Sequence, residues 1–220
     1  MTALRRWWPL LALLALAFNL RPVAVSIGPV LTEISRDVGL DGVTAGLLTS
    51  LPTLCFAFFG AVAPWAARRF GAHRAILVSI IALMVGQGGR LLVEDPVPFL
   101  LLSVLALGGM AQANVLLPSL VRRHYPNRVG LATALYSLVM TVGVTLASTA
   151  TVPLAHALGG WRASLTSGVV IAVAALLCWI PLVLQAGRPR PHGPAEITLA
   201  AVAHTKLGWA MAILFGIQSA

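Results

Sequence analysis

Long apolar runs separated by short polar segments dominate the pattern of this chain. Six of the runs are long enough to cross a bilayer core of ~30 Å as helices that rise ~1.5 Å per residue. They cover Trp7–Ile27, Val43–Ala67, Ala75–Val93, Val97–Val121, Val129–Leu154 and Ala163–Leu184. A seventh run begins near Leu207. The pattern predicts an all-α integral membrane protein whose residues 1–185 form a six-span bundle.

Residues 186–206 form the longest polar segment between apolar runs. Its first half contains Gly187, Pro189, Pro191, Gly193 and Pro194, a composition that disfavours a helix. We predict a cytoplasmic linker here, followed at residues 207–220 by the incomplete start of a seventh span. A helix over residues 207–220 would be shorter than the bilayer core. A missing C-terminal six-helix half is therefore an expected partner.

The composition supports a membrane protein. Of the 220 residues, 59% are hydrophobic and only 10% are charged, a balance that ordinary soluble domains do not show. The formal net charge is +9, but the basic residues lie in short clusters between the apolar runs. This distribution predicts a lipid bilayer as the environment and argues against nucleic acid as a partner.

The clusters of charge also predict an orientation. Most of the 15 lysine and arginine residues lie before the first run or after the second, fourth and sixth: Arg5, Arg6, Arg68, Arg69, Arg74, Arg122, Arg123, Arg128, Arg188, Arg190 and Lys206. The opposite loops hold Arg36 and Arg162 with Glu33, Asp37, Asp41, Glu94 and Asp95. The positive-inside rule predicts a multi-pass plasma-membrane protein with a cytoplasmic N-terminus.

An alternative for the first run is a cleaved signal peptide. Arg5 and Arg6 would form its basic region, Trp7–Ala17 its apolar region, and Ala15-Leu16-Ala17 its cleavage motif. The topology argues against this alternative, because removing the span would reverse the orientation predicted for the N-terminus.

The run Asn19-Leu20-Arg21-Pro22 interrupts the first span and is the main candidate site. An arginine in mid-span costs ~2.5–3.5 kcal/mol on insertion scales, so we expect Arg21 to face an aqueous cavity or an anion. Pro22 removes the backbone donor to the Phe18 carbonyl, which predicts a kink. Asn19 lies about 200° from Arg21 on an ideal helix and is expected to pack between helices. The alternative is that Arg21 is a structural charge paired with a neighbouring helix.

Two further spans carry polar groups. Gln112 and Asn114 also lie about 200° apart, so at most one should face a cavity, and Gly109 with Ala113 predicts close helix contact. In the fifth span a hydroxyl stripe stands beside Tyr136 and consists of Thr133, Ser137, Thr141 and Thr145. The alternative for this stripe is that the hydroxyls bond carbonyls of their own helix.

The remaining polar and cysteine residues predict structure rather than chemistry. Arg90 shares a helix face with Gln87 and is expected to pair with Glu94, four residues beyond it. Cys55 and Cys178 lie inside apolar runs and predict neither a disulfide nor a metal site. No intramembrane catalytic set, phosphate-binding loop or mid-membrane carboxylate is present, so neither an enzyme nor a cofactor is predicted.

A faint internal repeat is visible in the two halves of the bundle. Pro29-Val30-Leu31 precedes Thr49-Ser50-Leu51 much as Pro118-Ser119-Leu120 precedes Tyr136-Ser137-Leu138. The repeat predicts two three-helix units, inverted relative to one another because three is odd. Chance similarity between apolar segments is the alternative.

Several of these motifs together resemble the CynX/NimT-type (cyanate and nitroimidazole transporter-like) branch of the major facilitator superfamily. They are Asn19-Leu20-Arg21-Pro22 with Gly28-Pro29, Asn114–Pro118 with Arg122-Arg123 and Tyr125-Pro126, and Leu135-Tyr136-Ser137. The second-to-third loop is similar to the superfamily's gating motif and retains Arg69, Gly71 and Arg74 in type. Pro64 and Arg68 occupy its glycine and acidic positions, so the acid of the usual gating salt bridge is absent.

The resemblance implies the N-terminal half of a secondary transporter that works by alternating access. Spans one, four and five would line the cavity, and spans three and six would lie outside it. The implied solute is a small organic molecule, and an anion would suit Arg21. The solute-binding candidates are Asn19, Arg21, Gln112, Asn114, Tyr136 and Ser137, and the gating candidates are Arg68, Arg69, Gly71 and Arg74. We expect that this half does not transport without the other half. The alternative to a transporter is a truncated remnant or a membrane assembly partner without transport activity.

Overall fold

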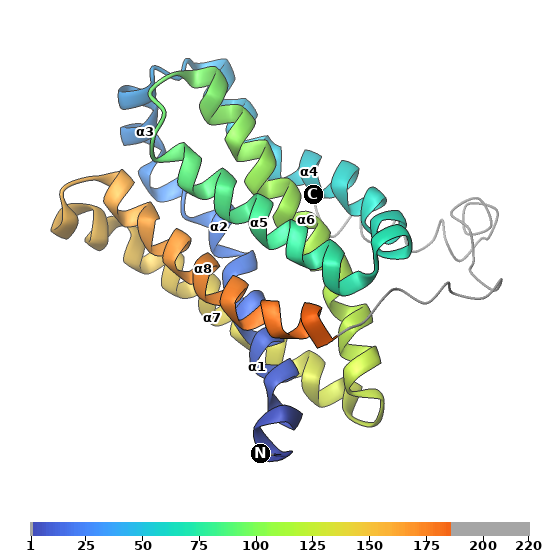
Figure 1. Cartoon of the computed structure of the whole chain (residues 1–220). Coiled ribbons are helices and arrows are strands. Elements are labelled where there is room, and N and C mark those ends of the chain that lie inside the picture. The colour runs from blue at the N-terminus through green and yellow to red at the C-terminus, as the bar shows by residue number, and fades with distance from the viewer. Residues whose placement is uncertain (1, 186–220) are drawn as a thin grey trace. The chain divides into compact units, whose positions relative to one another are not determined.

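A computed structural model describes residues 2–185, which form helices joined by short connections (Figure 1). No strand occurs among these residues. Six helical segments are long and apolar enough to cross a membrane, as the hydrophobic pattern predicts. The predicted linker and the start of the predicted seventh span lie outside the described residues.

The first span is longer than the hydrophobic pattern predicts and consists of four helical pieces. α1 (Thr2–Leu20) ends just before Arg21, and α2 (Pro22–Val25), the 3-10 turn η1 (Gly28–Val30) and α3 (Leu31–Val38) continue the path. The predicted end at Ile27 is therefore wrong. Pro22 and Pro29 each stand in the first turn of a new helical piece, where a missing N–H leaves no bond unmade. α3 then buries Ile34 and Val38 in the core.

The other five spans are single helices. They are α4 (Gly42–Phe70), α5 (Ala72–Arg90), α6 (Pro96–His124), α7 (Val129–Leu158) and α8 (Trp161–Gln185), with a 3-10 turn η2 (Pro126–Arg128) before α7. Four of them extend the predicted spans by a few residues at one or both ends. α5 instead stops before the predicted Val93, because the Leu91 and Leu92 N–H groups close tight turns onto the Gly88 and Gly89 carbonyls at 3.1 and 3.0 Å.

Local residues fix several helix ends. The Asp41 carboxylate caps α4 by accepting bonds from the Thr44 hydroxyl and N–H at 2.6 and 2.8 Å. These bonds hold the pKa of the Asp41 carboxyl below its usual value of 3.8. Gly39 and Gly159, with φ values of 72° and 83°, end α3 and α7 in the left-handed conformation that favours glycine.

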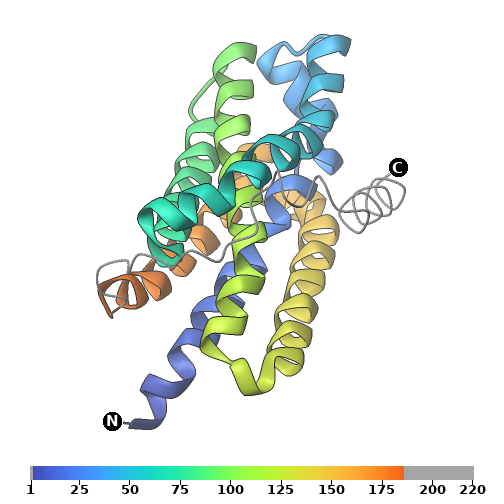
Figure 2. The same cartoon turned by 90° about the vertical axis from the view of Figure 1, so that its right-hand side faces the viewer.

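The spans pack in two groups that do not follow chain order. α6 packs along α4 and α5, whereas α1 packs along α7 and α8, and α5 joins the groups through α8 (Figures 1 and 2). The fourth span thus joins the second and third, and the first span joins the fifth and sixth. Each group takes members from both halves of the chain, so the bundle cannot separate into two sequential three-helix pieces.

Glycines allow the closest of these contacts. A Cβ at Gly86 of α5 would lie 2.5 Å from the Ala106 nitrogen and 2.6 Å from the Leu102 oxygen of α6. A Cβ at Gly109 would lie 2.9 Å from the Leu83 nitrogen of α5. Backbone therefore packs on backbone across the α5–α6 contact, which confirms the close approach that Gly109 and Ala113 predict.

α4 and α7 are the least covered of the six spans, and α8, at 22%, follows them closely. Only 17% of the most apolar stretch of α4 and 11% of that in the span containing α7 are buried, against 56% for α6. Leu138 and Leu146 of α7 and Phe58 of α4 are among their exposed side chains. α4 and α7 thus present long surfaces that the described residues leave open to lipid or to further protein.

Side-chain bonds tie the spans together at both ends of the bundle. At the end of the bundle that carries the acidic loop residues, Asp37 accepts a bond from the buried Trp161 indole at 2.8 Å and pairs with Arg162 at 3.3 Å. At the basic end, the Trp179 indole donates to the His73 carbonyl at 3.0 Å. These bonds connect α3 with α8 and α5 with α8, segments that are distant in sequence.

Candidate functional site

The break in the first span centres on Arg21. Its backbone φ and ψ, −79° and −38°, are helical, but the proline that follows ends the ladder of α1. The Arg21 carbonyl accepts the N–H groups of Ala24 and Val25 at 3.1 and 3.3 Å, so a new helical piece starts at once. The result is the kink that Pro22 predicts, near the midpoint of the span Trp7–Val38.

The Arg21 side chain is exposed. Within residues 2–185 its guanidinium makes no ion pair, hydrogen bond or cation–π contact. The alternative that Arg21 is a structural charge paired with a neighbouring helix therefore finds no partner in this part of the chain. A mid-span cation without a partner needs water or an anion, because lipid solvates it poorly.

The carbonyl that Pro22 frees is covered by α7. Gly143 of α7 is buried against Phe18, and a Cβ there would lie only 2.6 Å from the Phe18 carbonyl oxygen. The absence of a side chain at Gly143 allows the α7 backbone to lie directly over this oxygen. Neighbouring backbone thus covers the kink while the Arg21 side chain stays exposed.

Asn19 differs from Arg21, as the helical geometry predicts. Its side chain is only 2% exposed, and its Nδ2 atom has no hydrogen-bond partner. Asn19 lies among buried residues of α1, including Leu16 and Leu20. Its burial places it between helices.

Gln112 and Asn114 of α6 also have different surroundings. The Gln112 amide oxygen accepts a bond from the Ser79 hydroxyl of α5 at 3.2 Å, so Gln112 belongs to the α5–α6 contact. Asn114 is half-buried and has no side-chain bond among the described residues. Of the two amides, only Gln112 is held by a bond to a neighbouring helix in the described part of the chain.

Two of the four hydroxyls in the stripe of α7 bond carbonyls of their own helix. Thr141 donates to the Ser137 carbonyl at 3.0 Å, and Thr145 donates to the Thr141 carbonyl at 3.1 Å. Thr141, Thr145 and Ser137 are exposed, so most of the stripe lies on the open side of α7, and the protons of Thr141 and Thr145 are already engaged. Ser137 is exposed and Tyr136 is half-buried against the core.

The four gating candidates lie where α4 meets α5. Gly71 has φ of 87° and separates the two helices, which explains the glycine at this position. Arg68 and Arg69 occupy the last turn of α4, where cations favour the negative end of the helix dipole. The Arg69 guanidinium lies 6.0 Å from the Phe70 ring centre, and Arg74 is exposed.

The predicted pair of Arg90 with Glu94 does not form. Arg90 is only 3% exposed, and its Nε and Nη1 atoms lack partners, whereas Glu94 is exposed. The prediction assumed that the helix continues through both residues. Because α5 ends at Arg90, Glu94 lies beyond the last helical turn and the four-residue spacing no longer brings the two side chains together.

Two histidines that are far apart in the sequence meet at one end of the bundle. The Nε2 atoms of His73 and His124 lie 2.9 Å apart, at the start of α5 and the end of α6. One imidazole must donate and the other accept, so at least one ring is neutral. A spacing of 51 residues carries no local signal, and only the antiparallel packing of α5 on α6 shows the contact.

The chain matches a known family over nearly its whole length. The family profile described as Major Facilitator Superfamily matches residues 8–219. The 2-nitroimidazole transporter of Escherichia coli K12 is 34% identical over 215 residues, which is 94% of this chain and 52% of that protein. An uncharacterised Bacillus subtilis transporter, YycB, is 32% identical over 98% of this chain and 53% of its own length.

Two further proteins show the same relationship. The cyanate transport protein CynX of Escherichia coli K12 is 27% identical over 94% of this chain and 54% of its own length. A crystal structure of the peptide transporter POT in complex with sulfate shares the fold, with a TM-score of 0.72 and 20% identity. The match covers 95% of this chain and 46% of the POT chain. The chain therefore spans about half the length of the relatives it matches.

Proposed function

Because the chain belongs to the major facilitator superfamily, we propose that it forms the N-terminal half of a secondary transporter that moves a small organic anion by alternating access. The membership agrees with the resemblance seen in the sequence. Arg21 is the observation that carries the proposal. It is an exposed cation with no partner among residues 2–185, at a helix break near the middle of the first span.

In this proposal Arg21 binds the charged group of the solute. A guanidinium can hold a carboxylate-like anion through two parallel hydrogen bonds, which would both select and orient the solute. Asn114, Tyr136 and Ser137 lie on α6 and α7, both of which contact the first span, and they would contribute neutral polar contacts. Asn19 and Gln112 would hold the helices in position rather than touch the solute, because Asn19 is buried and Gln112 bonds Ser79 of α5.

The proposal also assigns a second six-helix half to the open surfaces. α4 and α7 are the least covered spans, and the chain spans about half of its relatives. A second half placed against them would enclose Arg21 in a cavity rather than leave it against lipid. The loop of Arg68, Arg69, Gly71 and Arg74 would lie at the cytoplasmic end, where it would contact the second half during gating.

Flux measurements test the role of Arg21. The chain is reconstituted in liposomes with a second half supplied as a separate polypeptide, the corresponding region of the 2-nitroimidazole transporter, and uptake of cyanate and 2-nitroimidazole is followed. Arg21→Ala should abolish saturable flux, and Arg21→Lys should keep part of it if the contact is a point charge. Arg36→Ala is the matched control, because Arg36 is an exposed arginine in α3 of the same span. Wild-type flux in Arg21→Ala would refute the role.

The same experiment separates the two classes of function. Flux that requires the second polypeptide supports a half-transporter. Saturable flux by the chain alone, lost in Arg21→Ala, would instead identify a homodimeric transporter. The absence of flux in every combination, with the protein correctly inserted, would favour an assembly partner that does not transport.

A further inference from the structure

We propose that a groove between the start of α1 and the start of α7 binds the headgroup of an anionic phospholipid. The groove has a volume of about 90 Å³. Trp7 and Leu10 of α1 line one part of it, and five residues between Tyr125 and Leu135 line the rest. Arg21 does not line it, so the proposal does not rest on the proposed transport of an anion.

The groove lies at the depth of the lipid headgroups. The N-terminal end of α1 and the turn between α6 and α7 lie at the same end of the bundle in both views (Figures 1 and 2). This end carries basic residues such as Arg122 and Arg123, and the charge pattern predicts that it is cytoplasmic. Two membrane-spanning stretches begin here, at Trp7 and at Pro126. Tryptophan and tyrosine are enriched where the apolar core meets the headgroups, and Trp7 and Tyr125 both line the groove.

Arg128 supplies the charge that a headgroup needs. Among the described residues it is the only charged one that lines the groove, and its side chain is exposed. Within residues 2–185 its guanidinium makes no ion pair, hydrogen bond or cation–π contact. A guanidinium can hold a phosphate through two parallel hydrogen bonds. Basic pockets between spans at the cytoplasmic side are typical sites for anionic headgroups.

No carboxylate on the neighbouring elements competes for Arg128. The sequence holds no aspartate or glutamate before Glu33, and none between Asp95 and Glu196. α1, η2 and α7 therefore offer no acidic side chain, and α6 offers none beyond its N-cap, Asp95, at its other end. The expected counter-charge of Arg128 is thus an anion from outside the described residues.

The apolar wall of the groove indicates a lipid rather than a free phosphate. Leu10, Leu131 and Leu135 line it together with Arg128. Leu131 is 57% exposed, and Leu138, seven residues further along the same face of α7, is 61% exposed. An apolar strip therefore runs from Arg128 along α7 away from the basic end. An acyl chain attached to a phosphate at Arg128 can follow this strip.

The turn before α7 holds Arg128 in place. Tyr125 interacts with the backbone of Leu10, which ties the turn to α1. The Arg128 N–H donates to the Tyr125 carbonyl at 3.0 Å, so the place of Arg128 follows from that of Tyr125. Trp7 is 53% exposed, and its indole N–H has no acceptor among the described residues. The indole is therefore a second donor available to a phosphate.

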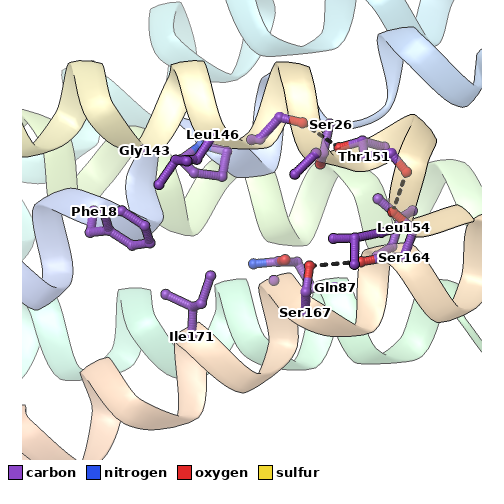
Figure 3. Close-up of a pocket in the computed structure, with 15 residues that line it drawn as sticks. Phe18, Ser26, Gln87, Gly143, Leu146, Thr151, Leu154, Ser164, Ser167 and Ile171 are labelled. Atoms are coloured by element: carbon purple, nitrogen blue, oxygen red, sulfur yellow. Dashed lines mark hydrogen bonds between the residues drawn. The ribbon is translucent and has the colours of Figure 1, made fainter. Parts of the chain in front are cut away.

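The size of the groove fits one part of a lipid. A volume of about 90 Å³ equals the share of about three waters in the liquid, so the groove takes a phosphate and not a whole lipid. A larger cavity of about 290 Å³ near Phe18, Leu146 and Ile171 is the contrast (Figure 3). None of its lining residues is charged, so a headgroup would lose its hydration there without compensation.

Lipid binding measured by native mass spectrometry tests the site. The chain is titrated in detergent with phosphatidylglycerol or with phosphatidylcholine of the same acyl chains, and the affinity for the first bound lipid is measured for each. The wild type should bind phosphatidylglycerol about fivefold more tightly, the equivalent of ~1 kcal/mol for one basic residue at a lipid surface. Arg128→Ala should remove this preference and leave phosphatidylcholine binding unchanged. The Arg128 side chain is exposed and unbonded, so this variant should fold like the wild type.

Arg123→Ala is the matched control. Arg123 is an exposed arginine in the last turn of α6, and it does not line the groove. The two variants lose the same charge from the same end of the bundle. A general attraction of anionic lipid to this end would weaken equally in both, whereas a site in the groove weakens only in Arg128→Ala.

A competitor separates the lipid from its headgroup. Glycerophosphoglycerol carries the same anion without acyl chains and should not displace phosphatidylglycerol. Displacement at equal concentration would identify a site for a free phosphate compound and overturn the proposal. It is also overturned if the wild type binds the two lipids equally, or if Arg128→Ala and Arg123→Ala lower the affinity for phosphatidylglycerol alike.

Discussion

Replacing Gly86 by alanine should separate α5 from α6 and destabilise the bundle. The new Cβ would lie 2.5–2.8 Å from the Ala106 nitrogen, the Leu102 oxygen and the Ala106 Cα. These are backbone atoms and cannot turn aside as a flexible side chain would. Ordinary contact begins near 3.4 Å, so the helices must move apart by roughly 0.6–0.9 Å, and overpacking of this kind typically costs ~1–3 kcal/mol.

Gly88 offers a matched control two residues away on the same helix. A Cβ there would meet only Val169 at 4.0 Å, which is ordinary contact. Gly88→Ala should therefore be neutral or gain up to ~1 kcal/mol from the better helix propensity of alanine. The two substitutions make the same chemical change and share the gain in helix propensity, so their difference of about 1–3 kcal/mol isolates the cost of the interhelical contact.

Thermal unfolding of the detergent-solubilised chain, followed by tryptophan fluorescence, measures this difference. For a chain of this size ~1 kcal/mol shifts the melting temperature by about 2–4 °C. Gly86→Ala should melt several degrees below the wild type, and Gly88→Ala at or above it. If the two variants melt together, backbone contact at Gly86 does not set the distance between α5 and α6.

Three further predictions concern the ends of the bundle. Asp37→Ala should lower stability by about 1–3 kcal/mol because it leaves the buried Trp161 N–H without an acceptor; Asp95→Ala, an exposed cap without a side-chain bond, is the control, and equal melting temperatures would contradict the role of Asp37. The Asp41 carboxyl should titrate below 3.8, so its cap on α4 is fully present at neutral pH and lost as the pH falls through the lowered value; ¹³C NMR of Asp41 checks this, and Thr44→Ala should move the pKa back up. Cysteines replacing Arg69 and Arg123, in a background without Cys55 and Cys178, should react only with cytoplasmic reagents and one replacing Asp95 only with external reagents, and the reverse pattern would overturn the predicted orientation.

Local sequence is enough to predict the class of fold and the main candidate residue, Arg21. Apolar runs of span length can bury their backbone polar groups in a bilayer only as helices, so length and hydropathy predict six spans without knowledge of packing. Pro22 cannot donate to the Phe18 carbonyl in any environment, so the kink at Arg21 follows from local chemistry. Helical geometry also predicts different surroundings for Asn19 and Arg21, and burial agrees with it.

The ends of the spans depend on competition between hydrogen bonds within a helix and contacts made outside it. The first span continues past Ile27 because α3 buries Ile34 and Val38 in the core. The polar residues around them in the sequence give no sign of this burial. α5 stops at Arg90 because its last residues close tight turns, and this end removes the expected partner of Arg90. Helix ends are decided by small differences between bonds within the helix and contacts outside it.

Contacts between residues that are distant in the sequence follow from how the helices pack. The different surroundings of Gln112 and Asn114 depend on Ser79, thirty-three residues before Gln112 on another helix. The pairing of His73 with His124 depends on α5 lying along α6. Helical periodicity fixes the direction of a side chain relative to its own axis, but packing fixes which helix stands in that direction, and that choice is made by non-local contacts such as those at Gly86 and Gly109.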